Sequence, residues 1–182
     1  MRVLVAYATR SGGTRGIAER IAQRLRTRGH EADVASVSDA LGIPTYEAYV
    51  IGSAVYLGQW QKDAVAFVES NAALLRKRPT WLFSSGPLGK DPRTASGEDK
   101  RETAVYAKVI AALTEAAHPR GHRVFGGLLE PDHLSLGPRL MRILPAGRRL
   151  LEEGDFRDWA EIEAWTDEIA GELSQAKVPA AT

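Results

Sequence analysis

The sequence predicts an α/β protein with a doubly wound, five-stranded parallel sheet and an insertion after the fifth strand. Two observations support this: short apolar runs alternate with helix-patterned segments, and polar, glycine-containing loops follow the runs. Strands that are buried on both faces of a parallel sheet are typically continuous apolar runs. The helical connections between such strands are right-handed. We expect 182 residues to form one domain over 1–175, with the insertion at 128–154 and a frayed tail at 176–182.

Five segments carry the strand signals. Val3–Ala6 is the first apolar run, and residues 31–34 alternate as a half-exposed edge strand does. Apolar runs predict the third, fourth and fifth strands at 49–52, 81–83 and 123–127.

Helical spacing connects these strands. Four sets of apolar residues mark the inward helix faces: Ile17, Ile21 and Leu25; Ala64, Val65, Val68, Ala72 and Leu75; Tyr106, Ile110, Leu113 and Ala117; Ile162, Trp165, Ile169 and Leu173. Gly29 is a predicted helix stop, and Asp158 with Glu161 has the spacing of a capping box for the last helix.

The composition excludes several classes of protein. Hydrophobic residues make up 44% and charged residues 26%, as in ordinary globular proteins. The absence of cysteine excludes disulfides, iron-sulfur clusters and thiol catalysis. A net charge of +1 gives no indication of a nucleic-acid partner. The first strand begins at position 1 and no apolar run could cross a bilayer, so we expect a cytoplasmic protein.

Residues 8–14 join the first strand to the first helix and have the composition of a phosphate-binding loop. A helix N-terminus offers unpaired N–H groups to an anion, and Gly12 and Gly13 allow close backbone approach. The loop follows neither the dinucleotide fingerprint nor the Walker pattern. Its hydroxyl groups suit a terminal phosphate monoester. The alternative from the loop alone is an ordinary Ser/Gly turn that caps a helix.

This loop resembles the phosphate loop of flavodoxins, Ser/Thr-x-Ser/Thr-Gly-x-Thr. The four marked positions are occupied by Thr9, Ser11, Gly12 and Thr14. The resemblance implies FMN as the cofactor and a strand order of 2-1-3-4-5. In that order the loops after strands one and three meet, with the loop after strand four beside them.

An isoalloxazine ring needs apolar walls and backbone partners along its rim. We expect the loops after the third and fourth strands to supply them, with Gly58 able to turn a carbonyl towards the flavin. Taken alone, Tyr56 or Trp60 could equally cover the next helix. The full set of predicted cofactor-binding residues is Thr9, Arg10, Ser11, Gly12, Gly13, Thr14, Ser53, Ala54, Val55, Tyr56, Leu57, Gly58, Trp60, Ser85, Gly86, Pro87, Leu88 and Gly89.

Phosphate-accepting response regulators share this fold and are the structural alternative. They need carboxylates after the first and third strands, to hold a metal ion and accept phosphate. The sequence has residues 8–10 (Ala-Thr-Arg) and 52–54 (Gly-Ser-Ala) there, so this alternative fails.

Over nearly its whole length the chain also resembles the menaquinone-dependent protoporphyrinogen dehydrogenases, a family of compact flavodoxin-like enzymes of bacterial haem synthesis. The resemblance is carried by residues 9–15 with 17–18, and by residues 52–58, 124–127, 139–142 and 158–159. It implies an FMN-dependent oxidoreductase whose redox partner is a porphyrinogen or a quinone. The alternative is a one-electron carrier of the flavodoxin type; such carriers are acidic, and the near-neutral charge disfavours it.

The insertion contains an apolar helical stripe flanked by arginines. Arg139 and Arg142 could meet a substrate carboxylate or the anionic inner face of a membrane, or could form a solvated face on a covering helix. His133 is the one weak candidate for a proton donor; the other histidines are expected at the surface or in loops. No histidine spacing indicates a metal site, and the oligomeric state is not predicted.

Overall fold

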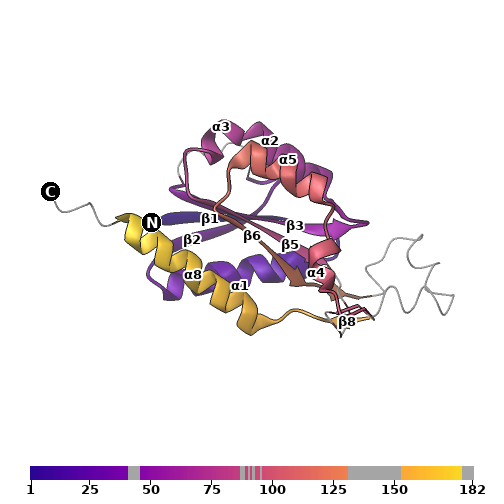
Figure 1. The fold of residues 1–182 in the computed structure, drawn as a ribbon. Coiled ribbons are helices and arrows are strands. Elements are labelled where there is room, and N and C mark those ends of the chain that lie inside the picture. The colour runs from indigo at the N-terminus through magenta and orange to yellow at the C-terminus, as the bar shows by residue number, and fades with distance from the viewer. Residues whose placement is uncertain are drawn as a thin grey trace.

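The computed structural model describes residues 1–40, 46–86, 89, 91, 93–94, 96–130 and 153–177. Within them, five parallel strands form the central sheet in the order β2-β1-β3-β5-β6 (Figure 1). The strands are β1 (Arg2–Ala8), β2 (Glu31–Ser36), β3 (Ala48–Tyr56), β5 (Thr80–Gly86) and β6 (Gly121–Gly126). Because β5 and β6 are the fourth and fifth parallel strands along the chain, the predicted order 2-1-3-4-5 is confirmed.

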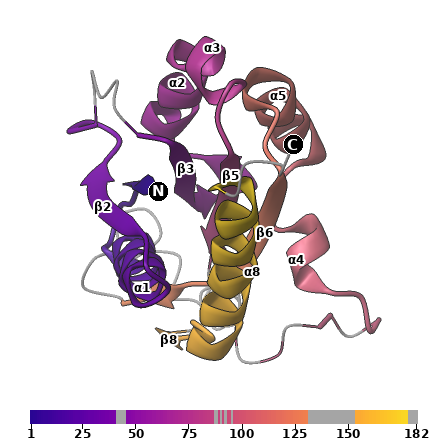
Figure 2. The ribbon, with the colours of Figure 1, turned by 90° about the vertical axis from the view of Figure 1, so that its left-hand side faces the viewer.

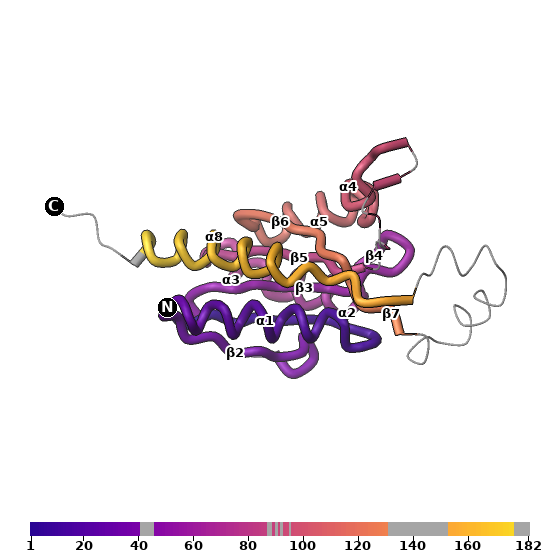
Figure 3. The backbone as a smooth tube through the Cα atoms, turned by 90° about the horizontal axis from the view of Figure 1, so that it is seen from below, coloured from indigo at the N-terminus to yellow at the C-terminus, as the bar shows by residue number. Residues whose placement is uncertain are grey.

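Helices cover both faces of the sheet (Figures 1 and 2). One face is covered by α1 (Gly13–Thr27) and α8 (Trp159–Lys177), which lie side by side in Figure 3. The other is covered by α2 (Lys62–Ser70), α3 (Ala72–Leu75) and α5 (Ala107–Ala117), while the short α4 (Lys100–Thr103) precedes α5. Successive side chains of β1 enter opposite cores, as a strand buried on both faces requires.

Ion pairs join α1 to α8. The Asp167 carboxylate accepts hydrogen bonds from the guanidinium groups of Arg24 and Arg28, at N–O distances of 2.5–2.7 Å. These hydrogen bonds hold the pKa of the Asp167 carboxyl far below its ordinary value. The start of α8 matches the sequence prediction, because the N–H of Glu161 donates to Asp158 Oδ1 at 3.0 Å.

Three predicted element boundaries are wrong. The fourth parallel strand, expected to end at Phe83, continues to Gly86 as β5. Residues 53–60, expected as a loop, continue β3 to Tyr56 and return as the antiparallel β4 (Gln59–Trp60). The helix expected across residues 64–75 is divided at Asn71, whose side chain donates to the Phe67 carbonyl at the end of α2.

Two side chains lie elsewhere than predicted. His122, expected at the surface or in a loop, lies in β6 and is half-buried. His30 lies in the loop between α1 and β2, in agreement with the prediction, although its side chain is buried. Tyr106, expected inward, is 49% exposed because it occupies the N-cap of α5 rather than its interior.

The two ends of the predicted insertion are held together. Leu128–Leu129 (β7) pairs with Gly154–Asp155 (β8) in antiparallel fashion, and the Phe156 N–H donates to the Gly127 carbonyl. The residues between them that carried predictions, His133, Arg139 and Arg142, lie outside the described residues. In the part of the chain that the structure describes, no helix is both long and apolar enough to cross a membrane.

Candidate functional site

The predicted phosphate loop connects the carboxyl end of β1 to the first turn of α1. Gly12 is the N-cap of α1 and has a φ of +84°, a conformation that a β-carbon would strain. Its N–H donates to Thr9 Oγ1 at 3.0 Å, which closes the loop on itself. The turn is therefore already shaped before any ligand binds.

The N-terminus of α1 fits an anion. Its N-cap residue is glycine, which has no side chain to cap the helix, and its first turn contains no acidic residue. Thr14, in the first turn of α1, is 2% exposed. A helix end with open N–H donors and nearby hydroxyls is what a phosphate monoester requires, so the residues present fit the phosphate of FMN.

The loop is supported from behind by β7. A β-carbon at Gly13 would lie 3.1 Å from Leu128 Cβ and 3.2 Å from Leu128 N, so a side chain there would push against this backbone. The base of the insertion is thus in contact with the phosphate loop.

The β3–β4 hairpin forms a second wall at the same edge of the sheet. Its two turn residues, Leu57 and Gly58, both have positive φ angles, as two-residue hairpin turns of type I′ require. Leucine is an unusual choice here, because asparagine or glycine adopts this conformation at lower cost. The Leu57 side chain is nevertheless 89% exposed, so packing within the described chain does not explain it.

Tyr106 supports this turn from the other side. Its N–H donates to the Gly58 carbonyl at 2.9 Å, and its ring lies so close to Gly58 that a β-carbon there would be 2.7 Å from ring atoms. Tyr106 was not predicted to be a site residue. From its spacing to Ile110 and Leu113, the sequence predicts it on the inward face of the helix.

Tyr56 connects the hairpin to the phosphate loop. Its hydroxyl lies 3.4 Å from Ser11 Oγ, and the Arg10 guanidinium carbon lies 5.3 Å from the centre of its ring. The register of the sheet explains this proximity, because Ala8 at the end of β1 is the neighbour of Ser53 in β3.

Other predicted residues of the hairpin have structural partners. Trp60 is 4% exposed, and its Nε1–H donates to Ser84 Oγ at 2.7 Å. Ser53 is fully buried and its Oγ accepts the N–H of Gln61 at 2.9 Å, while Val55 packs in the core. These side chains hold the hairpin in place.

His122 completes this buried chain of hydrogen bonds, since its Nε2 lies 2.8 Å from Ser84 Oγ. Because Ser84 accepts from Trp60, its own proton is available to donate to an unprotonated His122 Nε2. Burial lowers the pKa of the His122 imidazole to about 4, which favours the same neutral form.

The loop after β5 is only partly described. Ser85 and Gly86 are the last two residues of β5 rather than loop residues, and Ser85 is the sheet neighbour of Ala54. Gly89 is described, whereas Pro87 and Leu88 lie outside the described residues. In the described ranges, no cluster of histidine and acidic side chains has the arrangement of a metal site.

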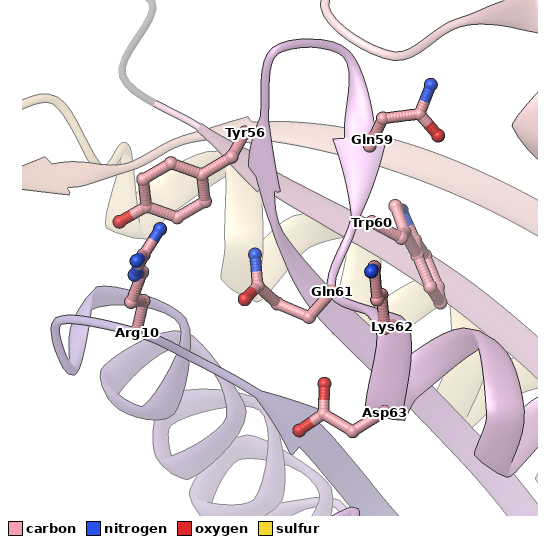
Figure 4. Close-up of a pocket in the computed structure, with 7 residues that line it drawn as sticks. All are labelled: Arg10, Tyr56, Gln59, Trp60, Gln61, Lys62 and Asp63. Carbon is pink, nitrogen blue, oxygen red and sulfur yellow. The ribbon is translucent and has the colours of Figure 1, made fainter. Parts of the chain in front are cut away.

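A cavity of about 560 Å³ opens beside Tyr56 (Figure 4). Arg10 lies on one side of it, and Gln61 and Asp63, from the start of α2, lie on the other. Four residues that line it were not identified from the sequence: Gln59, Gln61, Lys62 and Asp63.

Comparisons with known proteins agree with this geometry. The chain is 26% identical over 178 residues to protoporphyrinogen IX dehydrogenase [quinone] of Escherichia coli, covering 93% of this chain and 95% of that protein. The fold is similar to oxidised flavodoxin 1 from Bacillus cereus, with a TM-score of 0.58 and 13% identity over 95% of this chain and 99% of that one.

A longer protein contains a similar fold. Rubredoxin oxygen:oxidoreductase from Desulfovibrio gigas matches with a TM-score of 0.58 and 14% identity, covering 96% of this chain and 36% of that one. A family model described as a flavodoxin domain matches residues 4–143, which is more than half of the sequence. The chain therefore belongs to the flavodoxin domain family.

Proposed function

We propose that this protein is an FMN-dependent oxidoreductase that oxidises a porphyrinogen-like substrate or exchanges electrons with a quinone. The observation that carries the cofactor assignment is the N-terminus of α1, which has glycine at its N-cap and lies at the edge where β1 and β3 end side by side. The hydrogen bond from the Gly12 N–H to Thr9 Oγ1 closes the loop that precedes this helix. Membership of the flavodoxin domain family supports the same cofactor and a redox function.

Two regions of the chain would bind the cofactor, the phosphate loop and the β3–β4 hairpin. Residues 9–14 would hold the phosphate through backbone N–H groups and the hydroxyls of Ser11 and Thr14. Leu57, Tyr56 and the backbone of Gly58 would line the ring and keep water from it. When bound, FMN supplies the electron chemistry, and the protein supplies binding, orientation and electrostatics.

The substrate class rests on the relative from Escherichia coli, whose name specifies a porphyrinogen and a quinone and which aligns over nearly the full length of both chains. We propose a cytoplasmic protein whose insertion, through Arg139 and Arg142, contacts the inner face of the membrane or the substrate carboxylates. The alternative function is a one-electron carrier.

The first experiment identifies the cofactor of the purified protein. Its absorbance spectrum should show bound flavin, and mass analysis of the ligand released by denaturation should give FMN. A colourless protein that does not take up added FMN would overturn the proposal.

A turnover assay then distinguishes the proposed enzyme from a one-electron carrier. The flavin-loaded protein should oxidise a porphyrinogen with a quinone as acceptor over many cycles. A carrier would exchange single electrons with a protein partner and would show no such turnover. Flavin-free protein and free FMN are the two controls.

A further inference from the structure

The cavity beside Tyr56 adjoins the phosphate loop and shares Arg10 with it. Its lining comes from the phosphate loop, the β3–β4 hairpin and the start of α2 and consists of Arg10, Tyr56, Gln59, Trp60, Gln61, Lys62 and Asp63. Two of these side chains are cations and one is a carboxylate, so the lining has an excess of one positive charge.

The two cations of this cavity have no carboxylate partner among the described residues. Arg10 instead lies over the ring of Tyr56. Arg15, one turn into α1, is by contrast paired with Glu19 at 2.7 Å. The Asp63 carboxylate accepts the N–H of Ala64 at 3.1 Å, within its own helix. Arg10 and Lys62 therefore remain available to an anionic ligand.

The polar part of the lining is held in position. Gln61 is anchored through its backbone N–H, which donates to Ser53 Oγ at 2.9 Å, and its side-chain Nε2 lies 3.5 Å from the Ala54 carbonyl. Tyr56 supplies a flat aromatic wall, and its hydroxyl reaches Ser11 of the phosphate loop. A ligand in this cavity would thus lie directly beside the proposed flavin.

We propose that this cavity is the subsite for a carboxylate carried by a ring-containing redox substrate, with Arg10 and Lys62 as its charge partners and Tyr56 as its aromatic wall. The proposal rests on the proposed function, because it places this substrate next to the flavin. The net positive charge of the lining also favours the enzyme over the carrier. A carrier that docks basic proteins needs an acidic face, whereas this lining has one excess positive charge.

Isothermal titration with naphthalene-2-carboxylate tests the charge requirement, and naphthalene-2-carboxamide is the neutral probe of nearly the same shape. Flavin-loaded wild-type protein at low salt should bind the carboxylate more tightly than the amide, and the difference should shrink as salt is added. Equal affinity for the two probes, or binding of neither, would overturn the proposal.

Two substitutions should shift the carboxylate affinity in opposite directions. Lys62→Met should weaken it roughly three-fold, and Asp63→Asn should strengthen it to a similar extent, as expected for single charges at a solvent-facing site. The amide affinity should stay constant in both variants. Arg15→Met and Lys77→Met are the controls, since Arg15 is already paired and Lys77 lies in the turn before β5, at the opposite end of the sheet.

A competition experiment between FMN and the carboxylate probe tests whether the cavity is separate from the flavin site. FMN and the carboxylate probe should bind at the same time, so saturating FMN should leave the probe's affinity nearly unchanged. Mutual exclusion would assign the cavity to the flavin itself and overturn the subsite. Failure of the protein to bind FMN at all would instead remove the proposed function, while the probe titrations on flavin-free protein would still report on the cavity.

Discussion

The ring of Phe83 lies directly against Gly52, its neighbour on the adjacent strand, so that a β-carbon at position 52 would fall within the ring. Gly52 is therefore required by packing in the middle of the sheet. Phe83 in turn contacts Phe125 and Trp165, at ring-centre distances of 6.2 and 6.4 Å.

Alanine at two glycines should have opposite effects on stability. Gly52→Ala should lower the free energy of unfolding by about 2–3 kcal/mol, because Phe83 would have to leave its position. Gly171→Ala should raise it by about 0.5–1 kcal/mol, because this glycine lies in α8 and a β-carbon there would meet open space. Urea unfolding monitored by circular dichroism measures both. Similar midpoints for the two variants would contradict the packing at Gly52.

Removal of two hydroxyls should weaken cofactor binding. In the Ser11→Ala/Thr14→Ala double variant, each lost hydrogen bond to the charged phosphate should contribute on the order of 1.5–3 kcal/mol to the loss of FMN binding free energy. Fluorescence titration with FMN measures the loss. Thr27→Ala, at the opposite end of α1, is the control. An unchanged FMN affinity with native circular dichroism would exclude this loop as the phosphate site.

The two aromatic residues of the hairpin should separate into different roles. Tyr56→Leu should change the spectrum and midpoint potentials of the bound flavin, because Tyr56 lines the proposed site. Trp60→Phe should leave these nearly unchanged and lower the free energy of unfolding by about 1 kcal/mol, because it removes the hydrogen bond to Ser84 and keeps most of the packing. The reverse assignment of the two effects would place the ring on the other side of the hairpin.

His122 should make stability depend on pH. Its pKa is lowered to about 4 in the folded protein, so between this value and the ordinary 6.5 the unfolded chain binds more protons. Stability should therefore fall as pH falls through this window, by on the order of 3 kcal/mol in total. His122→Phe should flatten this dependence, and His118→Asn, at an exposed position, should not. Urea midpoints collected from pH 7 to 4 would show the difference.

Charge reversal in the insertion tests its proposed partner. Arg139→Glu/Arg142→Glu should leave FMN content and the reduction of small soluble dyes nearly intact, because the phosphate loop belongs to a different part of the chain. Turnover with porphyrinogen or a lipid quinone should fall sharply, and co-sedimentation with anionic liposomes should weaken if the membrane is the partner. Wild-type behaviour in every assay at low salt would leave the two arginines as a solvated face.

The parallel sheet could be predicted because each buried strand produced its own local signal. Val3–Ala6 and residues 49–52 are continuous apolar runs, and the loops that follow them contain the small and hydroxylated residues of a ligand site. The phosphate loop was predictable for the same reason, since strand, loop and helix are contiguous in the chain.

The hairpin could not be predicted in this way. Its turn has leucine where asparagine or glycine is usual, so the local turn signal was absent. The roles of Trp60 and His122 depend on Ser84, which lies 24 and 38 residues away from them in the chain. Such partners are set by the pairing of strands. The same is true of the cavity between Arg10 and Lys62, whose walls come from separate segments.

The pairing of β7 with β8 brings the two ends of the insertion to adjacent positions. A short turn from Leu129 to Gly154 would join them without moving β6 or α8, so the intervening residues can be exchanged as a cassette. Because β7 also contacts Gly13, such exchanges would take place within reach of the phosphate loop, where a new segment could bring a new substrate to an unchanged cofactor.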